Sequence, residues 1–201
     1  MTTNWLQKYP ETSIVNKAHE FAKDAHKDTK RWSGDPYITH CIAVAQTVND
    51  WGLDEPSIAA ALLHDVVEDT DYTIKDIEKK FGKEIAFLVD GLTKLKKIQY
   101  SDSDDPDTET LKKFILSFSK DLRVVIIKLA DRLHNVQTLK FLPADRQKRF
   151  AWETIEIYSP LAYRLGMQKL SGELADFAFP HLYPEEHKWL LENVEEEYRE
   201  R

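Results

Sequence analysis

Apolar residues recur at helical spacing along most of this chain, and this periodicity constrains the fold more than any other feature. In the first such segment, one helix face carries Ile14, Ala18, Phe21, Ala22 and Ala25. Thr12 or Ser13 could cap that helix. No segment alternates as a strand does, and the chain of 201 residues has only six glycines. The sequence therefore predicts an all-α fold, a bundle of about eight to ten helices.

Turn and cap residues divide this pattern into separate helices. The expected helices cover 14–25, 38–51, 55–64, 74–81, 83–97, 108–119, 121–139 and 143–166. Asp54 and Thr73 are the expected N-caps of the third and fourth of these helices. Two weaker helical segments follow, separated by Pro180 and Pro184, and the polar stretches 28–36 and 101–107 are expected to be loops.

Composition places the chain among ordinary globular proteins. Hydrophobic residues make up 42% and charged residues 31% of it, and its longest apolar runs are too short for a transmembrane helix. The first eleven residues lack the apolar core and cleavage site of a signal peptide. A single cysteine, Cys41, excludes an internal disulfide framework and predicts inert packing. We therefore expect a cytoplasmic protein.

The charge balance bears on the class of partner. The formal net charge is −7, which argues against binding to nucleic acid or to an anionic membrane. The last segment, 184–201, is strongly acidic, so the remainder of the chain is nearly balanced. That remainder could still contain a local basic pocket for a small molecule.

The segment around His64 turns abruptly from apolar to polar. One imidazole and three carboxylates follow within six residues: His64, Asp65, Glu68 and Asp69. On a continuous helix, His64 and Glu68 would be neighbours at i, i+4, as would Asp65 and Asp69. Imidazole with carboxylate suits a divalent transition metal. The alternative is a helix end that frays into solvent, where the acids are merely hydrated.

A second polar intrusion interrupts the apolar helix that contains Val124–Ala130. Asp131, Asn135, Thr138 and Leu142 follow at i, i+4, i+7 and i+11, which places them on one stripe of a continuous helix. That stripe could line a pocket with one metal ligand and polar groups for a substrate. The alternative is a solvated helix face.

Histidines elsewhere in the chain are harder to interpret. His40 begins an apolar helix, and a lone histidine there is usually a hydrogen-bonded core residue rather than a ligand. The remaining histidines have no comparable context and are interpreted as surface or structural residues: His19, His26, His134, His181 and His187.

Taken together, His40, His64-Asp65 and Asp131 resemble the H…HD…D signature of HD-domain metal-dependent phosphohydrolases. The sequence around these residues resembles the RelA/SpoT alarmone hydrolases more specifically. That resemblance is carried by RWSGDPYITH (31–40), ALLHDVVEDT (61–70), VDGLTKL (89–95), IKLADRLHN (127–135) and ETIEIYSPLA (153–162). It covers nearly the whole chain.

The resemblance implies Mn²⁺-dependent hydrolysis of guanosine tetra- and pentaphosphate at the 3′-pyrophosphate, giving GDP or GTP and pyrophosphate. It also implies a set of metal ligands, which are His40, His64, Asp65 and Asp131. Glu68 and Asp69 match the catalytic acidic pair of the family. The implied partner is thus a small anionic nucleotide.

The resemblance further implies residues that bind the substrate. Asn135 and Thr138 would hold the nucleotide or the attacking water, Leu142 would contact the base, and Arg31 would line the guanine or phosphate side. Further cations for the phosphates could come from Lys94, Lys96 and Lys97, although these also fit an ordinary basic helix end.

Two residues depart from the family pattern. Trp32 stands where the family usually has lysine, and its indole could stack on guanine or could be a surface or interface residue. Cys41 replaces the proline that commonly follows the first histidine, which leaves the neighbouring ligand in place.

The resemblance also suggests how the chain is organised. Residues 1–180 are expected to form the hydrolase domain, and 181–201 an acidic helical tail similar to the start of the linker to a synthetase domain. A stand-alone small hydrolase and the hydrolase part of a bifunctional enzyme both fit. Two other functions stay open: an HD-domain phosphohydrolase for another phosphorylated nucleotide or cofactor, and a non-catalytic nucleotide-sensing module.

Overall fold

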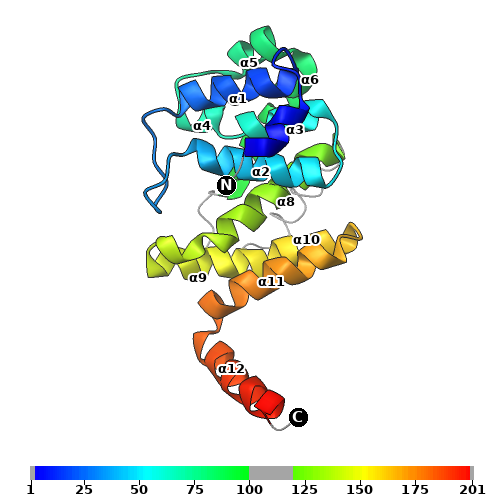
Figure 1. Ribbon diagram of the computed structural model, residues 1–201. Coiled ribbons are helices and arrows are strands. Elements are labelled where there is room, and N and C mark those ends of the chain that lie inside the picture. Colours follow the sequence, from blue (N-terminus) through cyan, green and yellow to red (C-terminus); the bar gives the residue numbers. More distant parts are fainter. Residues whose placement is uncertain (1–2, 100–119, 200–201) are drawn as a thin grey trace. The chain divides into compact units, whose positions relative to one another are not determined.

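The computed structural model describes residues 3–99 and 120–199, and these are almost entirely helical (Figure 1). In chain order the elements are η1 (Thr3–Lys8), α1 (Ile14–Ala25), α2 (Ile38–Asp50), α3 (Glu55–Leu63), α4 (Val66–Asp69), α5 (Ile74–Phe81), α6 (Lys83–Gln99), α8 (Leu122–Gln137), η2 (Leu139–Phe141), α9 (Ala144–Glu153), η3 (Thr154–Tyr158), α10 (Ser159–Arg164), α11 (Gln168–Leu182) and α12 (Pro184–Arg199). Within the described ranges, extended pairing is limited to one isolated bridge between Lys30 and Pro36. The predicted all-α class is confirmed.

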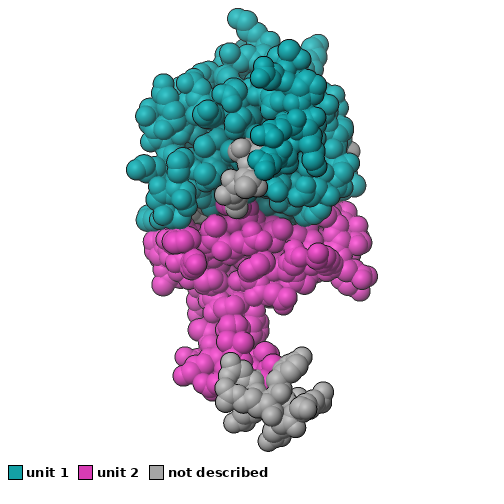
Figure 2. Space-filling model, viewed as in Figure 1, with its two compact units in different colours: residues 1–131 teal, residues 132–201 magenta. Residues whose placement is uncertain are grey.

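Two compact units divide the chain, residues 1–131 and 132–201 (Figure 2). Helix α8 begins in the first unit and ends in the second. No described helix is long and apolar enough to cross a membrane.

Helix α3 is the central helix of the first unit. Every residue from Ser57 to Leu63 is buried, and the helix packs against α1, α2 and α6. A short helix that is apolar on all sides must be surrounded by other elements, which explains its central position. It carries the residues that follow Leu63 into the interior of the unit.

Local capping signals set three helix starts as predicted. The side chains of Ser13, Asp54 and Thr73 accept hydrogen bonds from backbone N–H groups at the starts of α1, α3 and α5. Thr73 and Asp76 form a reciprocal capping box. The helix expected at 108–119 and the loop expected at 101–107 lie outside the described residues.

The helix expected to continue through His64 instead ends at Leu63. His64 and Asp65 form a turn, and the separate helix α4 begins at Val66. The reason is local, because Nδ1 of His64 donates to the carbonyl of Ala61 at 2.8 Å. The backbone N–H of Asp65 would take that carbonyl in a continuous helix. The i, i+4 neighbours expected here therefore do not share one helix.

Helices α6 and α8 come close together at Gly91. A Cβ atom at this glycine would lie 2.9 and 3.1 Å from the two methyl groups of Val124. Only glycine allows this approach without displacing Val124. The contact fixes the part of α8 that leads to Asp131.

In the second unit, proline has a different effect from the one expected. The single helix predicted from Pro143 to Gly166 is interrupted by the π-helical turn η3 just before Pro160. Proline lacks an N–H group and crowds the carbonyl of the preceding turn, which a widened turn relieves. Pro180, in contrast, lies inside α11, so the break predicted there is wrong. The domain boundary expected after residue 180 falls within this helix and stays a prediction.

Arg132 is the largest buried side chain of the second unit. Its guanidinium lies 3.8 Å from the ring centroids of both Phe150 and Tyr158, and its Nη2 lies 2.9 Å from Oε2 of Glu153. Two aromatic faces and one carboxylate therefore satisfy this buried cation.

Candidate metal centre

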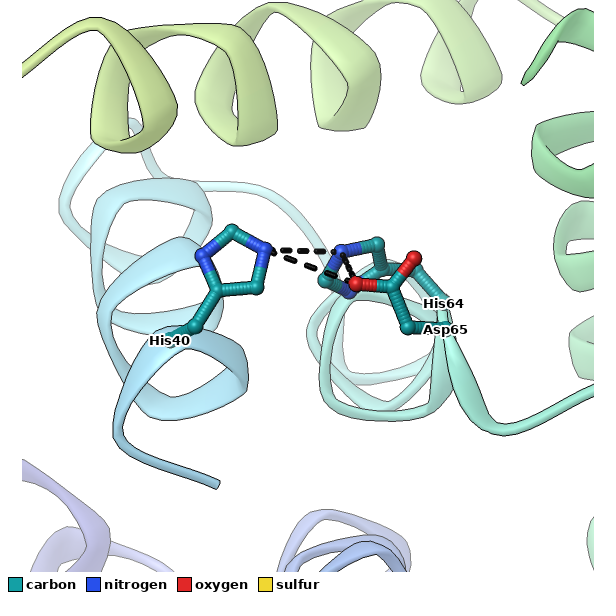
Figure 3. Close-up of side chains that lie close together, drawn as sticks. All are labelled: His40, His64 and Asp65. Atoms are coloured by element: carbon teal, nitrogen blue, oxygen red, sulfur yellow. Dashed lines mark hydrogen bonds and ion pairs between the residues drawn. The ribbon is translucent and has the colours of Figure 1, made fainter. Parts of the chain in front are cut away.

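Four side chains from three elements of the first unit converge on one point. His40 comes from α2, His64 and Asp65 from the turn after α3, and Asp131 from α8. Figure 3 shows His40 facing His64 and Asp65 across a short gap. All four side chains are buried, with at most 4% of any residue exposed. The helix end that would fray into solvent is therefore not what the structure shows.

The donor atoms are spaced as ligands of one ion would be. Nε2 of His40 lies 3.2 Å from Nε2 of His64 and 3.1 Å from Oδ1 of Asp131. Oδ2 of Asp65 lies 2.9 Å from the His64 nitrogen and 3.5 Å from the His40 nitrogen. Bonds of about 2.1 Å place two ligand atoms about 3.0 Å apart at a right angle and about 3.4 Å apart at the tetrahedral angle. The donor set and its spacing fit a divalent transition metal.

Neighbouring groups hold three of these side chains in a ligand-like state. His64 donates from Nδ1 to the Ala61 carbonyl, which leaves the lone pair on Nε2 facing the cluster. Asp65 accepts a hydrogen bond from the Tyr37 hydroxyl at 2.7 Å. The outer oxygen of Asp131, Oδ2, accepts from Nζ of Lys128 at 2.7 Å. Such outer contacts orient metal ligands in known sites.

The electrostatics also point to a cation at this place. Burial lowers the pKa of His64, but the carboxylates of Asp65 and Asp131 outweigh burial and raise that pKa to about 10. Burial raises the pKa of Asp131, whereas Lys128 and the two imidazoles more than reverse this and bring it well below its ordinary value. Two buried carboxylates thus demand positive charge between them, which a proton or a divalent ion can supply.

Glu68 and Asp69 lie on the one-turn helix α4, directly after the ligand Asp65. Glu68 is half-buried and Asp69 is exposed. After burial and Asp65, the carboxylate of Asp69 is a further cause that raises the pKa of Tyr37, which places Asp69 on the same side of the fold as the cluster. Asp69 is therefore near the candidate site, and Glu68 precedes it on the same short helix.

The stripe predicted after Asp131 is only partly helical. Asn135 lies one turn further along α8 and is half-buried. The helix then ends at Gln137, because the Thr138 hydroxyl donates to the carbonyls of His134 and Asn135. Leu142 follows η2 in extended conformation, so it does not continue the helical stripe. These three residues belong to the second unit, and their role at the site stays a prediction.

The loop before His40 contains the other predicted substrate residues. The guanidinium of Arg31 lies 5.8 Å from the centroid of the Tyr37 ring, and Trp32 is 64% exposed. On α6, the exposed Lys94 pairs with Asp90 one turn earlier. The side chains of Lys96 and Lys97 lie outside the described residues.

Three residues next to the cluster were not singled out from the sequence. Tyr37 and Lys128 each contact one of the ligands, and His26 is almost fully buried against Tyr37. Each of the first two stands three residues before a ligand, His40 and Asp131 respectively. That spacing was a usable signal, because residues at i and i+3 are neighbours on a helix. For His26 no local signal exists, since only the fold brings it to Tyr37.

Comparison with known proteins decides the family. The family model described as "HD domain" matches residues 18–168, three quarters of the chain. This chain belongs to the HD-domain family. An HD domain implies a divalent metal, in agreement with the buried cluster of His40, His64 and Asp65.

Individual relatives of this HD domain are named for alarmone metabolism. It is 45% identical over 192 residues to the bifunctional (p)ppGpp synthase/hydrolase SpoT of Escherichia coli, covering 94% of this chain and 27% of that protein. It is 44% identical to the guanosine-3′,5′-bis(diphosphate) 3′-pyrophosphohydrolase of Aquifex aeolicus, covering 95% of this chain and 27% of that one. The chain thus spans about a quarter of the length of these curated relatives.

A solved structure agrees with these sequence relatives. The structure titled as a metazoan ortholog of SpoT that hydrolyzes ppGpp matches with a TM-score of 0.55 and 27% identity, over 85% of this chain and 87% of that chain. The predicted resemblance to the RelA/SpoT alarmone hydrolases is confirmed, as is the HD-domain helical fold.

Proposed function

We propose that this HD domain is a Mn²⁺-dependent (p)ppGpp 3′-pyrophosphohydrolase that releases pyrophosphate from guanosine tetra- or pentaphosphate and leaves GDP or GTP. The observation that carries the proposal is the buried cluster of His40, His64, Asp65 and Asp131. In it the two imidazole nitrogens lie 3.2 Å apart, and each lies 2.9 to 3.7 Å from an oxygen of Asp65 and of Asp131. Relatives that carry this activity in their names support the choice of substrate. A cytoplasmic location is part of the proposal, in keeping with the free, buried thiol of Cys41.

The four ligands would hold the ion through two imidazole nitrogens and two carboxylate oxygens. When bound, a divalent ion supplies a water of lowered pKa and offsets the charge that develops on phosphorus. Mn²⁺ is the proposed ion because the resemblance to the RelA/SpoT alarmone hydrolases implies it. Histidine and carboxylate ligands together suit divalent transition metals, Mn²⁺ among them. Burial of the ligands keeps the site in a low dielectric, which strengthens its attraction for charge.

Glu68 and Asp69 are the proposed groups for proton transfer. Both lie on α4, which follows the ligand Asp65. Glu68 is half-buried and Asp69 is exposed, so both are within reach of solvent. One carboxylate would take a proton from the attacking water and one would return a proton to the leaving group, a contribution of about 10²–10⁴-fold in rate. Asn135 would assist by holding the nucleotide or the water.

The remaining residues are proposed to bind the nucleotide. Arg31 would contact the guanine or a phosphate, Thr138 would hold the nucleotide, and Leu142 would contact the base. Trp32, with most of its surface exposed on the loop before the first ligand, would stack on the base. This exposure supports stacking because the side chain of Trp32 is accessible to a ligand.

Product analysis tests the proposal directly. We expect the purified protein with Mn²⁺ to convert guanosine tetraphosphate to GDP and pyrophosphate, separated by ion-exchange chromatography. His64→Ala and Asp65→Ala should abolish turnover, whereas His19→Ala, which removes a half-buried histidine from the same unit, should retain it. Metal-loaded wild-type protein without turnover of guanosine tetraphosphate would refute the alarmone hydrolase. It would leave a hydrolase for another nucleotide or a nucleotide-sensing module.

A second candidate function is hydrolysis of another phosphorylated nucleotide or cofactor. The observation that favours it is Trp32, because an exposed indole replaces the lysine expected at this position of the loop. A panel of 2′- and 3′-phosphorylated nucleotides and dinucleotides, compared by kcat/KM, separates the two. A panel member that exceeds guanosine tetraphosphate would replace it as the substrate.

A further inference from the structure

Tyr37 contacts the carboxylate of Asp65 through its hydroxyl group. Its hydroxyl donates a 2.7 Å hydrogen bond to Oδ2 of Asp65. That same oxygen lies 2.9 Å from Nε2 of His64 and 3.5 Å from Nε2 of His40, so it is the carboxylate oxygen that faces the two imidazoles. A rotation of the Asp65 carboxylate away from the imidazoles would break the bond to Tyr37.

Two imidazoles fix the ring of Tyr37. The His26 ring stacks on it with centroids 4.7 Å apart and an interplanar angle of 25°. The His40 ring meets it edge-on, at 5.8 Å and 84°. The ring is thus packed between two imidazoles, and these contacts help to set the direction of its hydroxyl. Aromatic pairs in such geometries stabilise beyond their buried area.

His26 is an unusual residue for the first of these contacts. Only 1% of it is exposed, and neither ring nitrogen has a hydrogen-bond partner. Burying two polar nitrogens unpaired carries a cost, so such groups are rare and each calls for an explanation. His26 is the C-cap residue of α1, and its ring stacks on the ring of Tyr37. This stack accounts for the presence of a buried imidazole ring at position 26.

We propose that Tyr37 is a positioning residue for Asp65, and that the stacked ring of His26 holds Tyr37 in place. A series of contacts thus runs from the His26 ring through the Tyr37 hydroxyl to the carboxylate oxygen of Asp65 that faces the metal site. The inference rests on the metal centre of the proposed function but not on the identity of the substrate. Outer-shell partners of this kind are worth about 10–100-fold in metal affinity.

Calorimetric titration of the metal-free protein with Mn²⁺ tests the first link without any substrate. We expect Tyr37→Phe, which keeps the ring and removes the hydroxyl, to weaken Mn²⁺ binding by about 10-fold or more. The matched control is Tyr9→Phe, which removes a 2.8 Å hydrogen bond to Asn49 elsewhere in the same unit and should bind Mn²⁺ as the wild type does. Tyr37→Phe with wild-type affinity would overturn the proposal.

The second link is tested by substitution at His26. His26→Ala should weaken Mn²⁺ binding, and His26→Phe should restore it, because phenylalanine supplies a ring for the stack. In the Tyr37→Phe background, His26→Ala should have little further effect, since it acts through the missing hydroxyl. Additive losses, or no rescue by phenylalanine in a folded protein, would overturn the part assigned to His26.

The outcomes also separate this inference from the proposed function. A wild type that binds no divalent ion would overturn both. A wild type that binds Mn²⁺ but hydrolyses no alarmone would leave the positioning of Asp65 intact and refute only the substrate.

Discussion

At the scale of single residues, Lys128 is the partner that keeps Asp131 charged inside the protein. Both side chains are almost fully buried, and Nζ lies 2.7 Å from Oδ2. The carboxylate therefore presents Oδ1 to the two histidines while its other oxygen is compensated by a permanent cation.

We predict that Lys128→Met destabilises the metal-free protein by about 3 kcal/mol, because it breaks a buried ion pair and leaves Asp131 with less compensation. A divalent ion can replace part of the missing charge, so Mn²⁺ should raise the melting temperature of this variant more than that of the wild type. Urea unfolding in EDTA and thermal melts with Mn²⁺ measure the two effects.

Lys23→Met is the matched control for this substitution. It also breaks a lysine–acid pair at i, i+3, here between exposed side chains of Lys23 and Glu20. Exposed pairs contribute little, so this variant should unfold as the wild type does. Equal stability of the two variants would contradict the role of Lys128.

At the scale of helices, one arginine ties together the starts of three of them. Arg123, at the beginning of α8, pairs with Asp121, with the α3 N-cap Asp54 and with Glu84 in the first turn of α6. Acidic side chains are favourable at helix N-termini, and Arg123 offsets their mutual repulsion. This cluster orients α8, which carries Asp131.

The cluster predicts a pH dependence of stability. The hydrogen bond from Arg123 lowers the pKa of Asp121. Burial raises the pKa of Asp54, but hydrogen bonds from Ser57 and Arg123 reverse this and lower it. A carboxyl with a lowered folded-state pKa stabilises above its ordinary pKa of 3.8, and this stability is lost as the pH falls through the folded-state value.

We therefore expect Arg123→Gln to be less stable than the wild type at pH 6 and to lose less stability on going to pH 3. Urea unfolding in EDTA at both pH values measures the difference, with the exposed Arg164→Gln as control. An unchanged loss of stability between pH 6 and pH 3 would argue against this account of the cluster.

At the scale of the whole molecule, metal binding and folding are coupled. The four ligands lie on segments that are far apart in sequence, and the site exists only when α2, α3 and α8 are packed together. An ion that binds only the folded state stabilises it by about 2.7 kcal/mol at 100 times its dissociation constant. For a chain of this size that corresponds to a rise of about 5–11 °C in melting temperature.

Thermal melts with and without Mn²⁺ should show this rise, and EDTA should reverse it. His64→Ala should show no rise at the same Mn²⁺ concentration, because one imidazole ligand is missing. A wild-type melting temperature that does not respond to any divalent ion would contradict a metal centre in this fold.

Much of the helical structure could be predicted from the sequence because its causes are local. The apolar spacing in α1, the caps Ser13, Asp54 and Thr73, and the turn before α2 all act within a few residues. The wrong predictions of helix continuation and helix ends also have local causes. The His64 ring competes for a backbone carbonyl, Pro160 requires a widened turn, and Pro180 is tolerated within a helix, and none of these follows from periodicity.

Some residues of the site could be predicted from the sequence, whereas others were found only in the tertiary structure. By itself the sequence determined an all-α chain whose His64-Asp65 and Asp131 follow apolar segments, and by resemblance it predicted His40 as their partner. Only the tertiary structure decided that these four side chains meet and that Tyr37, Lys128 and His26 support them. The physical reason is that periodicity and capping act between near neighbours in the chain, whereas a coordination site is made by packing between distant helices.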